Sequence, residues 1–163
     1  MALLDRCLIR LQHQNHAVNR GFPLHPSLKI TCRHELFGLV TFDLLSWKTF
    51  GKSWLCEDDF ASGRVRQELC DLKEPEVFAR HAELIAEAGL IFIDGPKDIV
   101  FEQAVFGYLR EQRVNHRRIV VFDDIKGPFV DRFWRSIDLP KLDITSFGNW
   151  NGTGIVELPN GGC

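Results

Sequence analysis

The fold of this 163-residue chain is decided by two short stretches, Leu90-Ile91-Phe92-Ile93-Asp94-Gly95 and Ile119-Val120-Val121-Phe122-Asp123-Asp124. Each is a run of four apolar residues that ends in an acid. Runs without polar alternation are typical of strands that are buried on both faces, as in a parallel sheet between two layers of helices. Apolar residues at helical spacing precede the first run, over about 74–89, and separate the two runs, over about 100–113. The alternation of strand and helix predicts an α/β fold.

Shorter patterns extend this interpretation in both directions. Strands are predicted at Leu39–Phe42, Arg64–Cys70, Leu142–Phe147 and Gly154–Leu158, the last two as an antiparallel hairpin around Asn149-Trp150-Asn151-Gly152, and a short helix at Phe129–Ile137. Near the N-terminus, apolar residues at positions 4, 7, 8 and 11 predict an amphipathic helix over Leu3–Val18, before the stop signal Arg20-Gly21-Phe22-Pro23. We therefore expect one domain over residues 1–163, a three-layer sandwich with a mostly parallel sheet and a C-terminal antiparallel hairpin.

Composition excludes several classes of protein. With 45% hydrophobic residues, 13 Phe and 4 Trp, the chain has the burial potential of a globular domain and not of a disordered one. The net charge is -2, so the chain lacks the excess of basic residues that is typical of a nucleic-acid binder. No apolar run is long enough to span a membrane and no signal peptide is visible, so neither a membrane nor a nucleic acid is an expected partner.

The five cysteines indicate a compartment. They are odd in number, and no two have the close spacing of a zinc knuckle. They are therefore interpreted as free thiols in a reducing cytoplasm.

Acidic residues recur where the predicted strands end. They are Asp43, Asp71, Asp94 and the pair Asp123-Asp124. Asp is common in turns and helix caps, so any one of them has an ordinary structural explanation. Ligands of open parallel sheets bind outside the carboxyl ends of the strands, and the repetition over four strands therefore favours a ligand site.

The ordered set from Phe37 to Leu158 resembles the class I S-adenosylmethionine-dependent methyltransferases, with their Rossmann-like sheet. The resemblance is carried by Leu90–Gly95, by Val120–Ile125 and by the terminal stretch Lys141–Glu157. It implies methyl transfer from S-adenosylmethionine to a small-molecule acceptor.

The resemblance also assigns roles to individual residues. Asp43 matches the acid that holds the ribose hydroxyls of the donor, since a carboxylate accepts two hydrogen bonds from a cis-diol. Asp71 matches the acid that accepts from the adenine amino group, with Leu72 as apolar cover for the base, and Asp94 matches an acid near the reacting centre. In the metal-dependent branch of the family, equivalents of Asp94, Asp123 and Asp124 bind Mg²⁺, which would hold and acidify a substrate hydroxyl.

Two lysines follow these acids closely. Lys97 is a candidate catalytic base or binder of an anionic substrate, although a solvated lysine at a helix start is the commoner situation. Lys126 is interpreted as a counter-charge to Asp123 and Asp124.

One departure from the family divides the functional hypotheses. The family's glycine-rich loop after the first strand has no counterpart, because the one Gly-x-Gly is Gly152-Thr153-Gly154 in the terminal hairpin. Residues 1–36 are therefore expected to be divergent or truncated, without the first strand. The alternative to an enzyme is an inactive methyltransferase-like module for binding or assembly, whose incomplete sheet favours a homo-oligomer. A receiver-type phosphoryl-transfer domain is disfavoured, because its acidic pair follows the first strand and not a late one.

Overall fold

The computed structural model describes residues 8–12, 38–49, 56–147 and 151–161. The strands are β1 (Leu8–Gln12), β2 (Leu39–Asp43), β3 (Val65–Leu69), β4 (Leu90–Asp94), β5 (Arg118–Asp123), β6 (Lys141–Asp143) and β7 (Thr153–Leu158). The α-helices are α1 (Glu57–Ala61), α2 (Pro75–Ala86), α3 (Val100–Glu111) and α4 (Val130–Ser136), and the 3-10 turns are η1 (Trp47–Thr49) and η2 (Thr145–Phe147). Strands β2 to β5 and helices α2 to α4 confirm the elements predicted at those positions.

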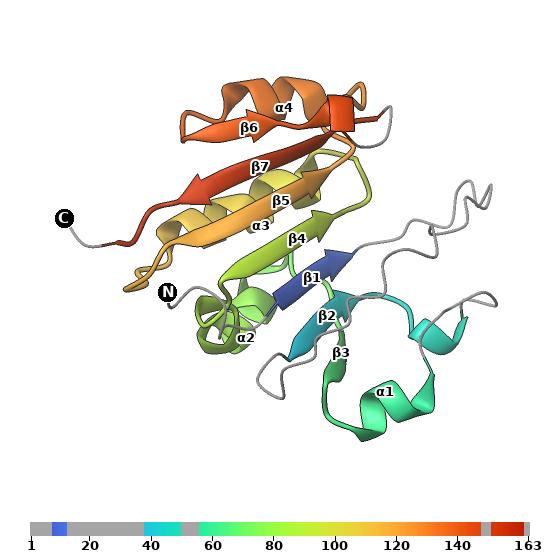
Figure 1. The fold of residues 1–163 in the computed structure, drawn as a ribbon. Coiled ribbons are helices and arrows are strands. Elements are labelled where there is room, and N and C mark those ends of the chain that lie inside the picture. Colours follow the sequence, from blue (N-terminus) through green and yellow to red (C-terminus); the bar gives the residue numbers. More distant parts are fainter. Residues whose placement is uncertain (1–7, 13–37, 50–55, 148–150, 162–163) are drawn as a thin grey trace.

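The strands form one α/β sheet in the order β3-β2-β1-β4-β5-β7-β6 (Figure 1). Strands β4, β5, β7 and β6 make its mixed part, in which β7 is antiparallel to both neighbours. Strands β2 and β3 make a parallel pair, and β1 joins the two parts by pairing in parallel with β2 and β4. The mostly parallel sheet and its C-terminal antiparallel hairpin are therefore confirmed.

The strand β1 corrects the prediction at the N-terminus. Residues 8–12 form a central strand, and the parts of the predicted helix at 3–7 and 13–18 lie outside the described residues. The expected loss of the first strand was therefore also wrong. Apolar residues in so short a run fit the helical and the extended template equally, and pairing with strands on both sides decides between them.

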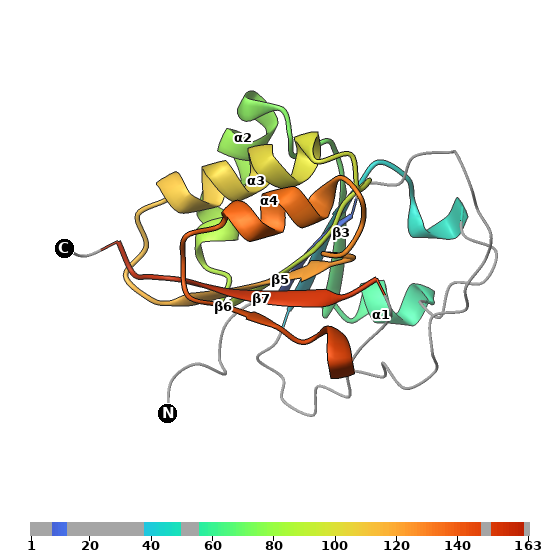
Figure 2. The ribbon, with the colours of Figure 1, turned by 90° about the horizontal axis from the view of Figure 1, so that it is seen from above.

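The three longer helices, α2, α3 and α4, lie together over one face of the sheet (Figure 2). Alternate residues of β5 and β7, such as Val120, Phe122 and Val156, are fully buried on that face. Their neighbours in sequence, such as Val121 and Ile155, are only partly buried.

The described residues thus show two layers, and residues such as Phe92 and Val121 are only partly buried, which corrects the expectation of strands buried on both faces. The third layer of the expected sandwich stays a prediction, because residues 13–37, between β1 and β2, lie outside the described residues. The crossover from β2 to β3 is described in part. Its described part holds only η1 and the five-residue α1, which lies beside β3, and neither is a helix long enough to cover the second face of the sheet.

The predicted strand Leu142–Phe147 also ends early. Strand β6 stops at Asp143, whose carboxylate accepts hydrogen bonds from the backbone N–H and the hydroxyl of Thr145. An Asp side chain that bonds the backbone two residues ahead forms a turn, so the chain continues as η2 and not as a strand.

None of the described helices has the length and apolar character that crossing a bilayer requires.

Candidate functional site

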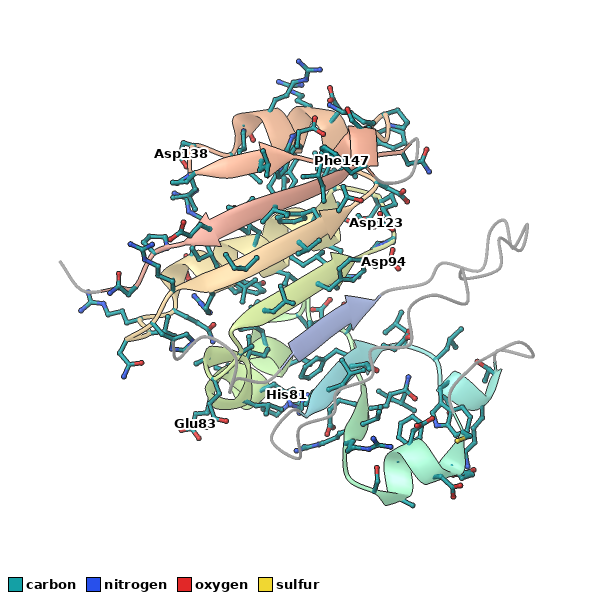
Figure 3. The ribbon with its side chains drawn as sticks, viewed as in Figure 1. His81, Glu83, Asp94, Asp123, Asp138 and Phe147 are labelled. Atoms are coloured by element: carbon teal, nitrogen blue, oxygen red, sulfur yellow. The ribbon has the colours of Figure 1, made fainter. Side chains whose placement is uncertain are left out.

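The site lies at the edge of the sheet where the parallel strands end. Asp43 is the last residue of β2, Asp94 the last of β4 and Asp123 the last of β5. Figure 3 shows Asp94 and Asp123 as neighbours at this edge, whereas Asp138 lies at the opposite end of the strands. The register pairs Gln12, the last residue of β1, with Asp94. The strand order reverses direction between β1 and β4, because β2 and β3 lie on one side of this pair and β5 lies on the other. Such a position is the topological switch point, where α/β sheets bind ligands.

Lys97 lies among the acids of β4 and β5. Its Nζ is 3.1 Å from Asp94 Oδ1 and 3.8 Å from Asp124 Oδ2, and it donates a hydrogen bond of 3.2 Å to the backbone carbonyl oxygen of Asp123. The side chains of Lys97, Asp94 and Asp124 are each about a quarter exposed, at 24%, 24% and 25%. Lys97 is therefore not a solvated lysine at a helix start; it connects the ends of two neighbouring strands.

A strained turn holds Lys97 in this place. Its backbone φ is 62°, in the left-handed region that residues with a side chain rarely adopt. Its N–H donates to Glu102 Oε1 at 3.1 Å. A Cβ on Gly95 would lie 2.4 Å from that same oxygen and 2.6 Å from Phe101 Cδ1, so only glycine fits two residues before Lys97.

Glu102 is the functional candidate that the sequence interpretation missed. It is 2% exposed, and its Oε2 has no hydrogen-bond partner within the described part of the chain. A signal was present, because Glu102 is spaced three, four and seven residues from the buried Val105, Phe106 and Leu109. An acid at helical spacing with core residues has to be buried, and a buried carboxylate requires partners.

Asp124 has an unusual electrostatic environment. Burial raises the pKa of its carboxyl, and the neighbouring Asp123 and Asp94 add to this effect, while Lys97 and a hydrogen bond with Asn151 oppose it. Its backbone φ of 57° is also left-handed. Among the described residues, the non-glycine residues with positive φ are Lys97, Ile99 and Asp124. All of them lie in the two loops that meet at this site, and backbone strain of this kind concentrates at functional sites.

The remaining predicted donor-binding residues lie on the other side of β1. Asp43 is 3% exposed and its Oδ1 accepts the N–H of Leu45 at 3.3 Å. Asp71 accepts the N–H of Lys73 at 3.1 Å and pairs with the Lys73 ammonium at 3.0 Å, which raises the pKa of that lysine. Leu72 is 1% exposed and belongs to the apolar core. The structure thus groups Asp94, Lys97, Asp123 and Asp124, and the roles predicted for Asp43, Asp71 and Leu72 stay predictions.

The interpretation of Lys126 is corrected. Its Nζ lies 2.5 Å from Asp143 Oδ2, so it compensates the acid that ends β6 and not Asp123 or Asp124. Hydrogen bonds from Lys126 and Thr145 lower the pKa of Asp143 to about 2.

This pair predicts a small, pH-dependent effect on stability. Because the folded-state pKa of Asp143 lies below the unfolded value, its contribution is present above about pH 4 and is lost as the pH falls towards 2. We expect Asp143→Asn to lower the free energy of unfolding at pH 7 by less than about 1 kcal/mol, since both side chains are more than a third exposed. Urea denaturation should show the difference from wild type shrinking below pH 4. A difference that is constant from pH 7 to pH 2 would contradict the prediction, and Asp138→Asn serves as the control.

The described residues contain no group of three or more His, Cys, Asp or Glu side chains placed to hold a metal ion. Binding of Mg²⁺ by Asp94, Asp123 and Asp124 stays a prediction, and the position of Lys97 opposes it.

Comparison of the chain with known proteins found no family model, no curated protein and no solved structure that matches it.

Proposed function

We propose that this chain is a Rossmann-like domain that transfers a methyl group from S-adenosylmethionine to a small-molecule acceptor. The observation that carries the proposal is the order of the sheet. It is the doubly wound order 3-2-1-4-5-6 with one antiparallel strand, β7, added between the fifth and sixth positions. Sheets with this order bind ligands outside the carboxyl ends of the two strands at the switch point, which are β1 and β4 here, with Asp43 and Asp94 ending the strands β2 and β4.

The reaction needs mainly positioning. The acceptor atom attacks the methyl carbon in line with the bond to sulfur, and the bonding electrons pass to sulfur to give S-adenosylhomocysteine. In the proposal Asp43 holds the ribose of the donor and Asp71 and Leu72 receive the adenine. Asp94 and Lys97 flank the reacting centre.

Lys97 and Asp124 have complementary roles in this proposal. The ammonium of Lys97 lies beside the carboxylates of Asp94 and Asp124, and an ammonium has three donors and no acceptor. It therefore positions an acceptor oxygen and stabilises the negative charge that develops there. The raised pKa of Asp124 suits it to receive the acceptor's proton. No step is assigned to Mg²⁺.

A specific observation favours a second candidate, a methyltransferase-like module without activity. After β1 ends at Gln12, no glycine occurs before Gly21, so the chain lacks the family's glycine-rich loop at the place where the donor would be approached. Such a module would act by binding or assembly, including self-association, which light scattering would detect.

A thermal-shift titration with S-adenosylhomocysteine distinguishes the two. At about 100 times its dissociation constant, the ligand should stabilise a competent site by roughly 2.7 kcal/mol. Asp43→Ala should abolish the shift, because it removes the proposed ribose ligand. Asp138→Ala, which makes the same change at the opposite end of the sheet, should preserve it (Figure 3). A folded wild-type protein that shows no shift would rule out the enzyme and favour the module.

The cytoplasm is the proposed compartment. Cys56 and Cys70, the two cysteines within the described residues, are free thiols. This arrangement is the ordinary one in a reducing environment.

A further inference from the structure

We propose that Lys97 is the resident cation of the acidic cluster formed by Asp94, Asp123 and Asp124, and that it excludes a divalent metal from this position. The inference concerns the metal requirement of the site. It is tested by metal binding, and so it does not depend on whether the chain transfers methyl groups.

The oxygens that a metal would need already surround an ammonium group. Lys97 Nζ has Asp94 Oδ1 at 3.1 Å, the Asp123 carbonyl oxygen at 3.2 Å and Asp124 Oδ2 at 3.8 Å. The first two distances suit an ammonium and the third is an ion-pair distance, whereas Mg²⁺ requires oxygens at about 2.1 Å in octahedral geometry. A metal ion that bound the same oxygens would lie within a few ångströms of a positive charge and would have to displace it.

The local backbone holds the lysine in place. Glu102 Oε1 accepts the N–H of Lys97, and Gly95 leaves the space that this contact needs. Asp98 Oδ1 accepts the N–H groups of Val100 and Phe101 at 3.0 and 3.1 Å, which starts α3 directly after the turn. A lysine that reached the acids by chance from a flexible surface would need neither a left-handed backbone nor a buried carboxylate behind it.

Charge gives the expected consequence of removing Lys97. Without it, the carboxylates of Asp94 and Asp124 lose the cation that lies between them. A positive charge within a few ångströms opposes the binding of a divalent cation. Removing the ammonium should therefore improve the affinity of this position for such a cation by at least about tenfold.

The test is calorimetric titration with Mn²⁺, as a probe for divalent cations, of the full chain and its variants. Wild type and Lys97→Arg, which keeps the positive charge, should show no binding at this site. Lys97→Met, which keeps an unbranched side chain of similar length, should bind one Mn²⁺ at this site. Adding Asp124→Asn to Lys97→Met should remove the gained binding.

Two results would overturn the proposal. One is a wild-type protein that binds one Mn²⁺ and loses it on Asp124→Asn, because the metal and Lys97 would then share the site. The other is a folded Lys97→Met protein that binds no Mn²⁺, because the acids would then form no site for the lysine to close.

A second measurement applies if Lys97→Met does not fold. Proton–nitrogen NMR of the lysine ammonium groups in wild type should show one protected signal that persists when Mg²⁺ is added. Loss of that signal on adding Mg²⁺ would contradict the proposal. The proposed function is tested by a different measurement, the thermal shift with S-adenosylhomocysteine in the presence of a chelator. A failure of the proposed function and a failure of this inference therefore give different results.

Discussion

Phe122→Ala is expected to lower the free energy of unfolding by about 3–5 kcal/mol. Phe122 is 1% exposed and is the second-last residue of β5, beneath the layer of helices. Its ring makes edge contacts with Phe106, Phe133 and Trp134, at centroid distances of 5.3, 5.7 and 6.3 Å. Truncation removes buried apolar area and leaves a cavity that rigid aromatic neighbours cannot fill. A loss of this size is a large part of the stability of an ordinary domain.

The chain offers a matched control, Phe147→Ala, which makes the same change at a side chain that is 91% exposed in η2. We expect it to alter the free energy of unfolding by less than about 0.5 kcal/mol. Urea denaturation of both variants, followed by tryptophan fluorescence and circular dichroism, measures the difference. Equal losses for the two variants would show that the helices do not pack on β5 as described.

Gly154→Ala is expected to destabilise the protein by about 1–3 kcal/mol, although it adds only one methyl group. A Cβ at Gly154 would lie 2.6 Å from two atoms of the Trp134 indole and 2.9 Å from a third. Trp134 is itself 5% exposed and packs against Phe122, so the indole cannot move away without disturbing the core. Either β7 or α4 would therefore have to shift.

Gly107→Ala makes the same change with the opposite expected sign. Gly107 lies in the middle of α3, and a Cβ there would meet nothing within 4 Å. Alanine favours the helix over glycine by up to about 1 kcal/mol, so this variant should be more stable than wild type. Thermal unfolding of both variants measures the difference. If Gly154→Ala stabilised the protein, β7 would have to lie further from α4 than it does in this structure.

Local patterns were sufficient for most of the regular elements. Leu90–Asp94 and Arg118–Asp123 are strands, and Pro75–Ala86 and Val100–Glu111 are helices, where apolar runs and helical spacing predicted them. These elements are long or strongly patterned, and the signal lies within the element itself. Asp94 and Asp123 were predicted at the carboxyl ends of strands for the same reason, because the end of an apolar run can be identified from neighbouring residues alone.

Elements and contacts that depend on distant partners were not predicted. Leu8–Gln12 is a strand because β2 and β4 lie on either side of it, and its five residues alone fit a helix as well. Lys126 pairs with Asp143, 17 residues along the chain, although Asp124 is nearer in sequence. The η2 turn replaced the end of a predicted strand because the Asp143 side chain bonds Thr145.

The sequence by itself determined the α/β class, the positions of the acids and their common edge, because strand direction and strand ends follow from local apolar patterns. Only the tertiary structure decided that Lys97 lies between Asp94 and Asp124, that Glu102 is buried behind it, and that α2, α3 and α4 gather on one face of the sheet. Each of these features depends on how close two segments lie in the fold, and the local sequence of neither segment predicts that distance. A lysine beside an acid is solvated or paired according to which loop the fold brings opposite it, and here that loop follows β5.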